Sequence, residues 1–265
     1  MDDMQIPSVV YGPVPSWRLG RSLGIDPVST RGKTCSFDCI YCQLGRTAHP
    51  LTERRLFVTA EDLRRQLEEL RPVPVDTVTF SGVGEPTLAA NLRELVAVAR
   101  EAIGSRPIAV LTNASLLWRR DVQHDLQCFD IVVAKVDAAS EAMFQTINRP
   151  VGDLTQAQVV AGIREFRQGF GGRLALQMMF VEANRDQARA MAELARTLRP
   201  NEVQLNTPLR PCAVRPLSAA QMAAIEIEFA GMPTSNVYQA HRPSVVPCDA
   251  HATRQRRPQE GTPGQ

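Results

Sequence analysis

Short apolar segments alternate along this chain with longer segments of helical periodicity, and this alternation leaves few folds open. The apolar segments have the length and composition of strands. They span residues 22–26, 75–80, 108–111, 131–136, 174–181 and 203–205. Strands that alternate with helices favour parallel βαβ units with right-handed crossovers. Because only six such units are present, we predict an α/β fold, a partial (β/α)6 TIM-like barrel rather than a complete eightfold one.

Helices are expected between these strands. Thr59 and Asp62 resemble a capping box, and leucines at 63, 67 and 70 follow at helical spacing. Later helices are expected after the loop at 81–87 and within residues 116–126, 140–170, 185–198 and 218–229.

The 265 residues are enough for one large core, flanked by two segments of different composition. We expect an N-terminal extension at residues 1–21, a core domain at 22–241, and a Pro- and Arg-rich tail at 242–265 that is disordered. The chain begins without the basic and apolar regions of a secretory signal, and it lacks an apolar run of about 20 residues. A cytoplasmic protein that does not enter a membrane is expected.

Polar residues occur at or just beyond the predicted strand ends, where parallel α/β folds bind ligands. They are Cys35 to Cys42, Gly82 to Pro86, Thr112, Asn113, Lys135, Asp137, Glu182 and Asn206. We expect them to converge on one mouth of the barrel.

Cys35, Cys39 and Cys42 form a C-x₃-C-x₂-C motif on the loop after the first strand. In a reducing compartment such cysteines are metal ligands more often than disulfides. Three thiolates can bind three irons of a cubane and leave the fourth iron without a protein ligand. A structural zinc would require a fourth protein ligand, and bacterial ferredoxins use a different spacing. The spacing therefore indicates a [4Fe-4S] cluster with one open iron.

This motif, with an aromatic residue just before its last cysteine, resembles that of the radical S-adenosylmethionine (SAM) superfamily. The resemblance implies that the open iron chelates the amino and carboxylate groups of SAM. It implies that an electron from the reduced cluster breaks a carbon–sulfur bond of SAM, usually giving a 5'-deoxyadenosyl radical. It also implies an electron donor of the flavodoxin or ferredoxin type, and it places Tyr41 against the adenine.

Other segments resemble SAM-binding parts of the superfamily. Residues 81–87 are similar to its Gly-Gly-Glu-Pro loop, apart from an extra valine between the glycines. The similarity implies that the SAM ammonium is received by Gly82, Gly84, Glu85 and Pro86. Thr112 and Asn113 are similar to a Thr-Asn segment near SAM, although such residues also cap helices. Asn206 is a candidate for contact with the SAM ribose or carboxylate.

Lys135 and Asp137 are the candidate catalytic residues. A lysine inside an apolar strand is costly unless its charge has a partner. Three partners are open for Lys135: the SAM carboxylate, a substrate anion, or only Asp137.

A longer pattern, from residues 10 to 211, is similar to the branch that includes the wybutosine-synthesis radical SAM proteins. Those tRNA enzymes carry a second cluster whose cysteines precede the radical SAM motif, whereas this chain has no cysteine before Cys35. Cys212, His241, Cys248 and His251 are near one another in sequence, and either free thiols or a second metal or thiophilic site is open there.

Two classes of function are open, a radical SAM enzyme and a non-enzymatic iron–sulfur or zinc protein. Within the enzyme class, SAM could instead donate its 3-amino-3-carboxypropyl group, with methylthioadenosine as the co-product. The residues expected to hold the substrate are Arg18, Arg21, Lys135, Glu182 and Arg210. The candidate substrates are a tRNA base, a peptide or a small metabolite, and the modest net charge of +2 favours one smaller than tRNA.

Overall fold

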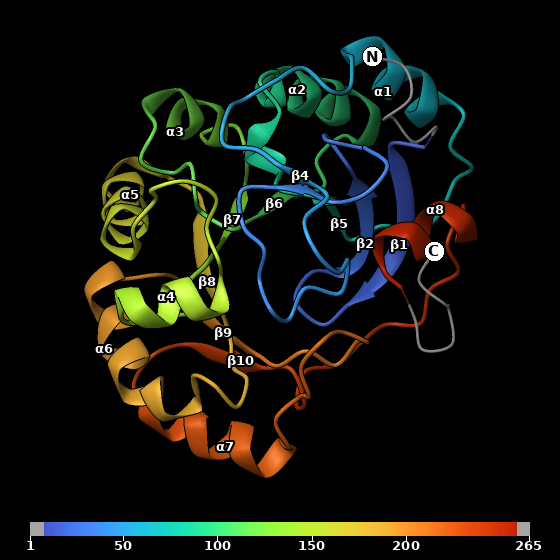
Figure 1. Cartoon of the computed structure of the whole chain (residues 1–265). Helices are drawn as coiled ribbons and strands as arrows, with labels where there is room; N and C mark the ends of the chain where they lie inside the picture. The colour runs from blue at the N-terminus through green and yellow to red at the C-terminus, as the bar shows by residue number, and fades with distance from the viewer. Residues whose placement is uncertain (1–7, 259–265) are drawn as a thin grey trace.

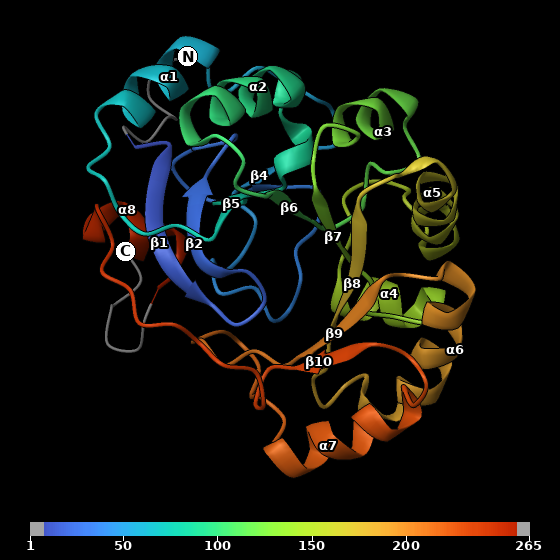
Figure 2. The ribbon, with the colours of Figure 1, turned by 180° about the vertical axis from the view of Figure 1, so that it is seen from behind.

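Within residues 8–258, which the computed structural model describes, eight strands form one curled sheet with helices along its outer face (Figures 1 and 2). In sheet order these strands are β1 (Val10–Ser16), β2 (Gly20–Ile25), β5 (Thr77–Phe80), β6 (Ile108–Thr112), β7 (Ile131–Lys135), β8 (Arg173–Met179), β9 (Glu202–Asn206) and β10 (Thr234–Asn236). β1 is antiparallel to β2, and the other neighbouring pairs are parallel. The predicted partial barrel is confirmed, and β1 and β10 extend it at its two edges.

The helices begin and end where local sequence favours it. Thr59 accepts a hydrogen bond from the Asp62 amide (3.1 Å) and caps the first helix, as predicted. The expected helical region 140–170 is two helices, because Pro150 and Gly152, which has a φ of 73°, interrupt it. The helices are α1 (Ala60–Glu68), α2 (Leu92–Ile103), α3 (Arg120–Leu126), α4 (Glu141–Ile147), α5 (Gln156–Gly169), α6 (Ala188–Leu198), α7 (Ala219–Glu228) and α8 (Ala250–Arg256). Short 3₁₀ turns span Pro86–Leu88 and Arg185–Gln187, and β3 (Thr34–Cys35) pairs with β4 (His49–Pro50).

The central strands are buried on both faces. All four residues of β5 are buried, as expected for a parallel strand that is covered by helices. Phe80 of this strand makes an edge-to-face contact with Phe129, with ring centroids 5.3 Å apart. This packing fixes the strands whose C-terminal ends form the rim of the barrel.

The expected N-terminal extension is part of the sheet. β1 pairs with β2 from Val10 opposite Ile25 to Ser16 opposite Gly20. A boundary at residue 22 would therefore cut through β2.

Part of the tail that was expected to be disordered is helical, because Ala250–Arg256 forms α8 beside β1 (Figure 1). The Arg256 side chain is buried, and its Nε atom donates to Asp26 Oδ2 at 2.8 Å. Its Nη2 atom donates to the Ser8 carbonyl at 2.5 Å, and its guanidinium lies 5.2 Å from the Tyr11 ring centroid. One buried ion pair thus anchors a segment whose polar composition indicated disorder. Residues 259–265 of the expected tail lie outside the described residues.

We expect Arg256→Met to lower the free energy of unfolding by about 3 kcal/mol, because Asp26 would remain buried without its counter-charge. Urea denaturation followed by circular dichroism measures this change. Arg254→Met removes an exposed arginine from the same helix and should change the free energy by less than about 0.5 kcal/mol. Equal stabilities of the two variants would contradict the anchoring role of Arg256.

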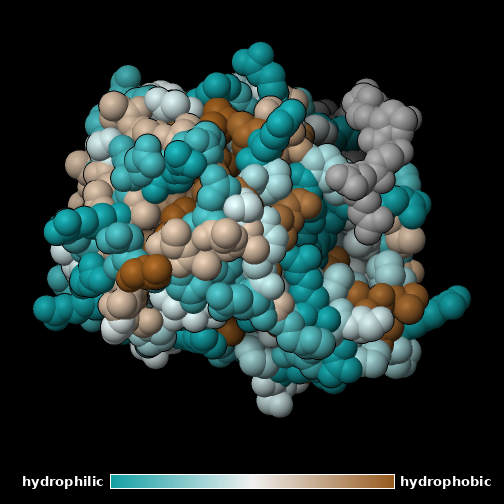
Figure 3. All heavy atoms as spheres, turned by 90° about the horizontal axis from the view of Figure 1, so that it is seen from below, coloured by the Kyte–Doolittle hydropathy of each residue, from teal (hydrophilic) through white to brown (hydrophobic). Residues whose placement is uncertain are grey.

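No helix within residues 8–258 has the length and apolar character needed to cross a membrane. The face in Figure 3 is mostly hydrophilic, and its hydrophobic side chains are scattered in small groups. The most exposed apolar side chains include Leu56, before α1, and Ile227, on α7. Single exposed apolar residues of this kind are ordinary on a protein surface.

Candidate active site

The cysteine loop follows β2 and lies at the rim formed by the C-terminal strand ends. Cys35 is buried, Cys39 and Cys42 are half-buried, and all three are free thiols. The Ile40 amide of the loop donates to the Ile147 carbonyl at the end of α4 (3.0 Å). The backbone of the loop is therefore held by a helix on the opposite side of the rim.

A buried lysine lies beside these thiols. Lys33 is 5% exposed, and its Nζ atom lies 3.8 Å from Asp38 Oδ1. Burial lowers the pKa of Lys33, but Cys42, Cys35 and Cys39 raise it, and the net shift is upward. Burial also raises the pKa of Cys35 to about 12, so this thiol is neutral until a metal replaces its proton. The ammonium is placed to offset the negative charge of three metal-bound thiolates.

Two asparagine side chains donate to cysteine sulfurs. Asn113 Nδ2 lies 3.5 Å from Cys35 Sγ and 2.9 Å from Ser36 Oγ. Asn148 Nδ2 lies 3.5 Å from Cys39 Sγ. Hydrogen bonds to ligating sulfurs shift the reduction potential of an iron–sulfur cluster, so both amides are placed to tune one.

Tyr41, Lys135 and Asp137 form one connected group. The Tyr41 hydroxyl and Asn148 Nδ2 (2.8 Å) both donate to Asp137 Oδ2. Asp137 Oδ1 accepts from the Met179 amide (2.9 Å) and lies 3.4 Å from Lys135 Nζ. Burial, and then the nearby Asp137 carboxylate, raise the pKa of Tyr41, so its hydroxyl stays protonated and donates. Of the partners considered for Lys135, the structure shows Asp137, and it adds the Tyr41 ring at 4.9 Å.

Glu85 joins the glycine loop to the end of β6. Its Oε1 atom accepts from the Thr87 amide (3.0 Å) and from the hydroxyls of Thr87 (2.7 Å) and Thr112 (2.6 Å). Its Oε2 atom accepts from the Asn113 amide (2.6 Å). Burial raises the pKa of Glu85, and these hydrogen bonds oppose the rise. The observed contacts tie two loops together, and a contact with the SAM ammonium stays a prediction.

Close packing of the loop explains why positions 82 and 84 are glycines. A Cβ atom on Gly82 would lie 2.0 Å from Asp26 Cγ, and one on Gly84 would lie 1.8 Å from the Thr34 carbonyl oxygen. A side chain at either position would therefore push the loop away from β2 and β3.

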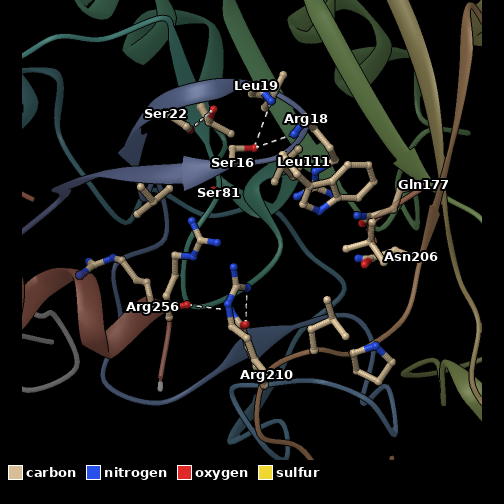
Figure 4. A pocket seen from close by; sticks show the side chains of 18 of the residues that line it. Ser16, Arg18, Leu19, Ser22, Ser81, Leu111, Gln177, Asn206, Arg210 and Arg256 are labelled. Atoms are coloured by element: carbon tan, nitrogen blue, oxygen red, sulfur yellow. Dashed lines mark hydrogen bonds between the residues drawn. The ribbon is translucent and has the colours of Figure 1, made fainter. Parts of the chain in front are cut away.

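A pocket of about 340 Å³ borders the cysteine loop at Tyr41 and Cys42. Figure 4 shows side chains that line it, including Leu111 and Gln177 of the barrel strands. Inner-face residues of three strands, Thr79, Leu111 and Gln177, line its wall. The predicted site residues that line it are Tyr41, Cys42, Gly82, Gly84, Lys135 and Asn206. The predicted site residues outside its lining are Cys35, Cys39, Glu85, Pro86, Thr112, Asn113 and Asp137. Some of the residues expected to converge on one mouth therefore line the pocket, and others do not.

The sequence assigned no role to Asn148 or Gln177, and it placed Lys33 only within a basic cluster around the cysteine motif that could face either an anionic ligand or solvent. Gln177 Oε1 lies 3.4 Å from Lys135 Nζ. The sequence could have indicated this residue, because its polar amide stands in an otherwise apolar buried strand. Lys33 adjoins the cysteine motif in sequence, but its burial beside the thiols depends on the tertiary fold and could not be predicted from its neighbours in the chain. Asn148 has no local signal, because it reaches the cysteines from the end of a distant helix.

Several other candidates lie away from the pocket. Arg21 forms a surface ion pair with Asp76 (2.5 Å), and Glu182 lies 3.3 Å from Arg185. In the described part of the chain, no three His, Cys, Asp or Glu side chains gather as ligands of a single metal ion. Within residues 8–258, Cys212, His241, Cys248 and His251 do not form such a group. A cubane differs from a single ion, because each thiolate binds its own iron.

The donor set fits a [4Fe-4S] cluster, since three free thiols surround one buried ammonium and two sulfurs accept amide hydrogen bonds. The adjoining pocket fits SAM, since it borders Tyr41 and Cys42 and has the volume of a small-molecule site.

Comparison with known proteins agrees with this chemistry. A family model described as the radical SAM superfamily matches residues 30–195. A UPF0026 protein from Synechocystis is 42% identical over 76% of this chain and 76% of its own length. A UPF0026 protein from Methanocaldococcus jannaschii is 41% identical over 77% of this chain, which spans 64% of that relative. The structure of Streptococcus suis SuiB bound to S-adenosylmethionine shares the fold, with a TM-score of 0.60 and 13% identity over 77% of this chain and 48% of SuiB. This chain belongs to the radical SAM superfamily.

Proposed function

We propose that this protein binds a [4Fe-4S] cluster through Cys35, Cys39 and Cys42 and reductively cleaves SAM to produce a radical that acts on a substrate. The observation that carries the proposal is the pocket, which opens directly onto the cysteine loop at Tyr41 and Cys42. When bound, the cluster and SAM supply the one-electron chemistry, while the chain binds and orients them.

Within this proposal the residues divide by position. Lys33, Asn113 and Asn148 surround the cysteine sulfurs, offset their charge and donate to them. Lys135 and Asn206 line the pocket and are among the side chains available to a ligand there. Asp137 is a positioning residue, because its carboxylate holds Tyr41 and Lys135.

The glycine loop has a corresponding place in the proposal. Gly82, Gly84 and Pro86 would present backbone carbonyls to the SAM ammonium, and Glu85 would keep the loop in register with Thr112. An electron donor of the flavodoxin or ferredoxin type would supply the electron. The relatives described above carry the UPF0026 description, so the similarity to the wybutosine branch stays a prediction.

Product analysis tests the proposal. The full chain, reconstituted without oxygen, should bind about four irons and four sulfides. With dithionite and SAM it should then release 5'-deoxyadenosine and methionine. Methylthioadenosine as the main product would replace the proposed cleavage with 3-amino-3-carboxypropyl transfer. If the cluster-loaded protein yields none of these products, the proposal that it is a SAM-cleaving enzyme is wrong.

A further inference from the structure

The lining of the pocket is strongly cationic. Among the described residues that line it there is no aspartate or glutamate. Two of its cations already have acidic partners, since Arg256 pairs with Asp26 and Lys135 with Asp137. The lining arginines that form no ion pair within residues 8–258 are Arg18, Arg210, Arg242 and Arg257. These four leave the pocket with an excess of positive charge.

Arg18 has the most restricted environment of the four. It lies in the turn between β1 and β2, and its Nε and Nη1 atoms are buried without a hydrogen-bond partner among residues 8–258. Its guanidinium carbon lies 5.3 Å from the Trp17 ring centroid, which restricts the plane of the group. Buried donors without partners are rare, and they commonly mark the position of an absent ligand or water.

Electrostatics in the pocket favour an added anion. Burial and then the neighbouring Arg257 lower the pKa of Arg18 to about 10, with a further contribution from Arg242 and opposition from Glu202. The arginines therefore destabilise one another's charge, and a bound anion would relieve this repulsion.

Figure 4 shows Arg18, Arg210 and Arg256 reaching the pocket from three separate segments. Arg210 Nη1 donates to Gln43 Oε1 at 2.6 Å, and Gln43 Nε2 donates to the Arg256 carbonyl at 2.9 Å. Gln43 directly follows the last cysteine of the motif. The cationic wall is thus linked by hydrogen bonds to both the cysteine loop and α8.

We infer that the substrate is a small anion whose phosphate or carboxylate group is bound by the guanidinium of Arg18, beside the other pocket arginines that form no ion pair within residues 8–258. A guanidinium carries a permanent charge and several N–H donors, which suit the oxygens of either group. This inference rests on the proposed function, in which SAM occupies the mouth of the same pocket. An extended nucleic acid fits less well, because these arginines line a pocket of about 340 Å³ and do not form a stripe along an open surface.

The position of Arg18 separates this anion from SAM. The turn that carries Arg18 precedes β2, whereas the cysteine loop follows it, so the two lie at opposite ends of this strand. The carboxylate of SAM is expected at the cysteine edge. Arg18 is therefore placed to bind a second molecule deeper in the barrel.

Calorimetric titration under anaerobic conditions tests the inference on the reconstituted full chain saturated with SAM. The two probes are phenyl phosphate and tricarballylate, which distinguish a phosphate from a carboxylate preference. At least one should bind, and Arg18→Gln should weaken that binding by about tenfold or more. Arg242→Gln should weaken it too, and because Arg242 is exposed this variant decides the question if Arg18→Gln does not fold. Arg21→Gln, at an exposed arginine outside the pocket, is the matched control and should bind the probe as the parent chain does.

Three results would overturn the inference. They are a parent chain that cleaves SAM but binds neither probe, equal affinities of the parent chain and the Arg18→Gln and Arg242→Gln variants, and binding of the probe only when SAM is omitted. Failure of SAM cleavage by the parent chain would instead refute the proposed function, so the two failures are distinguishable.

Discussion

Cys39→Ala is expected to abolish both cluster binding and SAM cleavage. Cys39 is one of three free thiols on the loop, and its sulfur accepts a hydrogen bond from Asn148 (3.5 Å). A cubane with only two protein thiolates loses a ligand that alanine cannot replace. Iron analysis, the visible absorption of the cluster and chromatography of SAM products measure the loss.

The matched control for this variant is Cys248→Ala. Cys248 is an exposed free thiol, and its backbone amide donates to the Gly12 carbonyl (2.7 Å). The control should keep the full iron content and the full rate of cleavage. Retention of a normal cluster in Cys39→Ala, or loss of it in Cys248→Ala, would show that the cluster ligands are assigned incorrectly.

The second large effect is expected for Asp137→Ala, which should lower the free energy of unfolding by about 4 kcal/mol. The change removes the counter-charge of the largely buried Lys135. It also removes the acceptor of the Tyr41 hydroxyl and of the Met179 backbone amide, and one of the acceptors of the Asn148 side-chain amide. Urea denaturation of the cluster-free chain measures the stability change.

Two further variants sharpen this test. Asp137→Asn keeps the shape and one acceptor oxygen, so it should lose about half as much stability. If Asp137 positions Tyr41, Asp137→Asn should also weaken SAM binding by the cluster-loaded chain. Asp153→Ala, at an exposed aspartate, should change stability by less than about 0.5 kcal/mol. A stable Asp137→Ala variant with unchanged SAM affinity would exclude the positioning role.

Local sequence was sufficient for the parts of the fold that depend on near neighbours. Apolar segments at strand length predicted β2 and β5 to β9, and the Thr59 cap marked the first helix. These signals are local because the period of apolar side chains follows directly from strand and helix geometry. The spacing of Cys35, Cys39 and Cys42 was likewise readable, since one loop carries all three thiols.

Contacts between distant segments could not be read in this way. Arg256 meets Asp26 across 230 positions, so a polar tail that looked disordered forms a packed helix. Glu85 accepts hydrogen bonds from Thr112 and Asn113, contacts between two loops that its own segment does not predict. The reason in both cases is that burial and hydrogen-bond partners depend on which segments the sheet brings together.

The sequence alone therefore determined that this protein has a partial α/β barrel and a loop of three cysteines suited to an iron–sulfur cluster. Only the tertiary structure decided how the surrounding polar residues are used. Lys135 is paired with Asp137, Arg21 lies at the surface, and Arg18 lies in the pocket with two buried donors and no partner among residues 8–258. The sequence does not show which of these charged side chains is buried. The three-dimensional neighbours determine whether a buried charge is compensated by a residue of the chain or by a ligand.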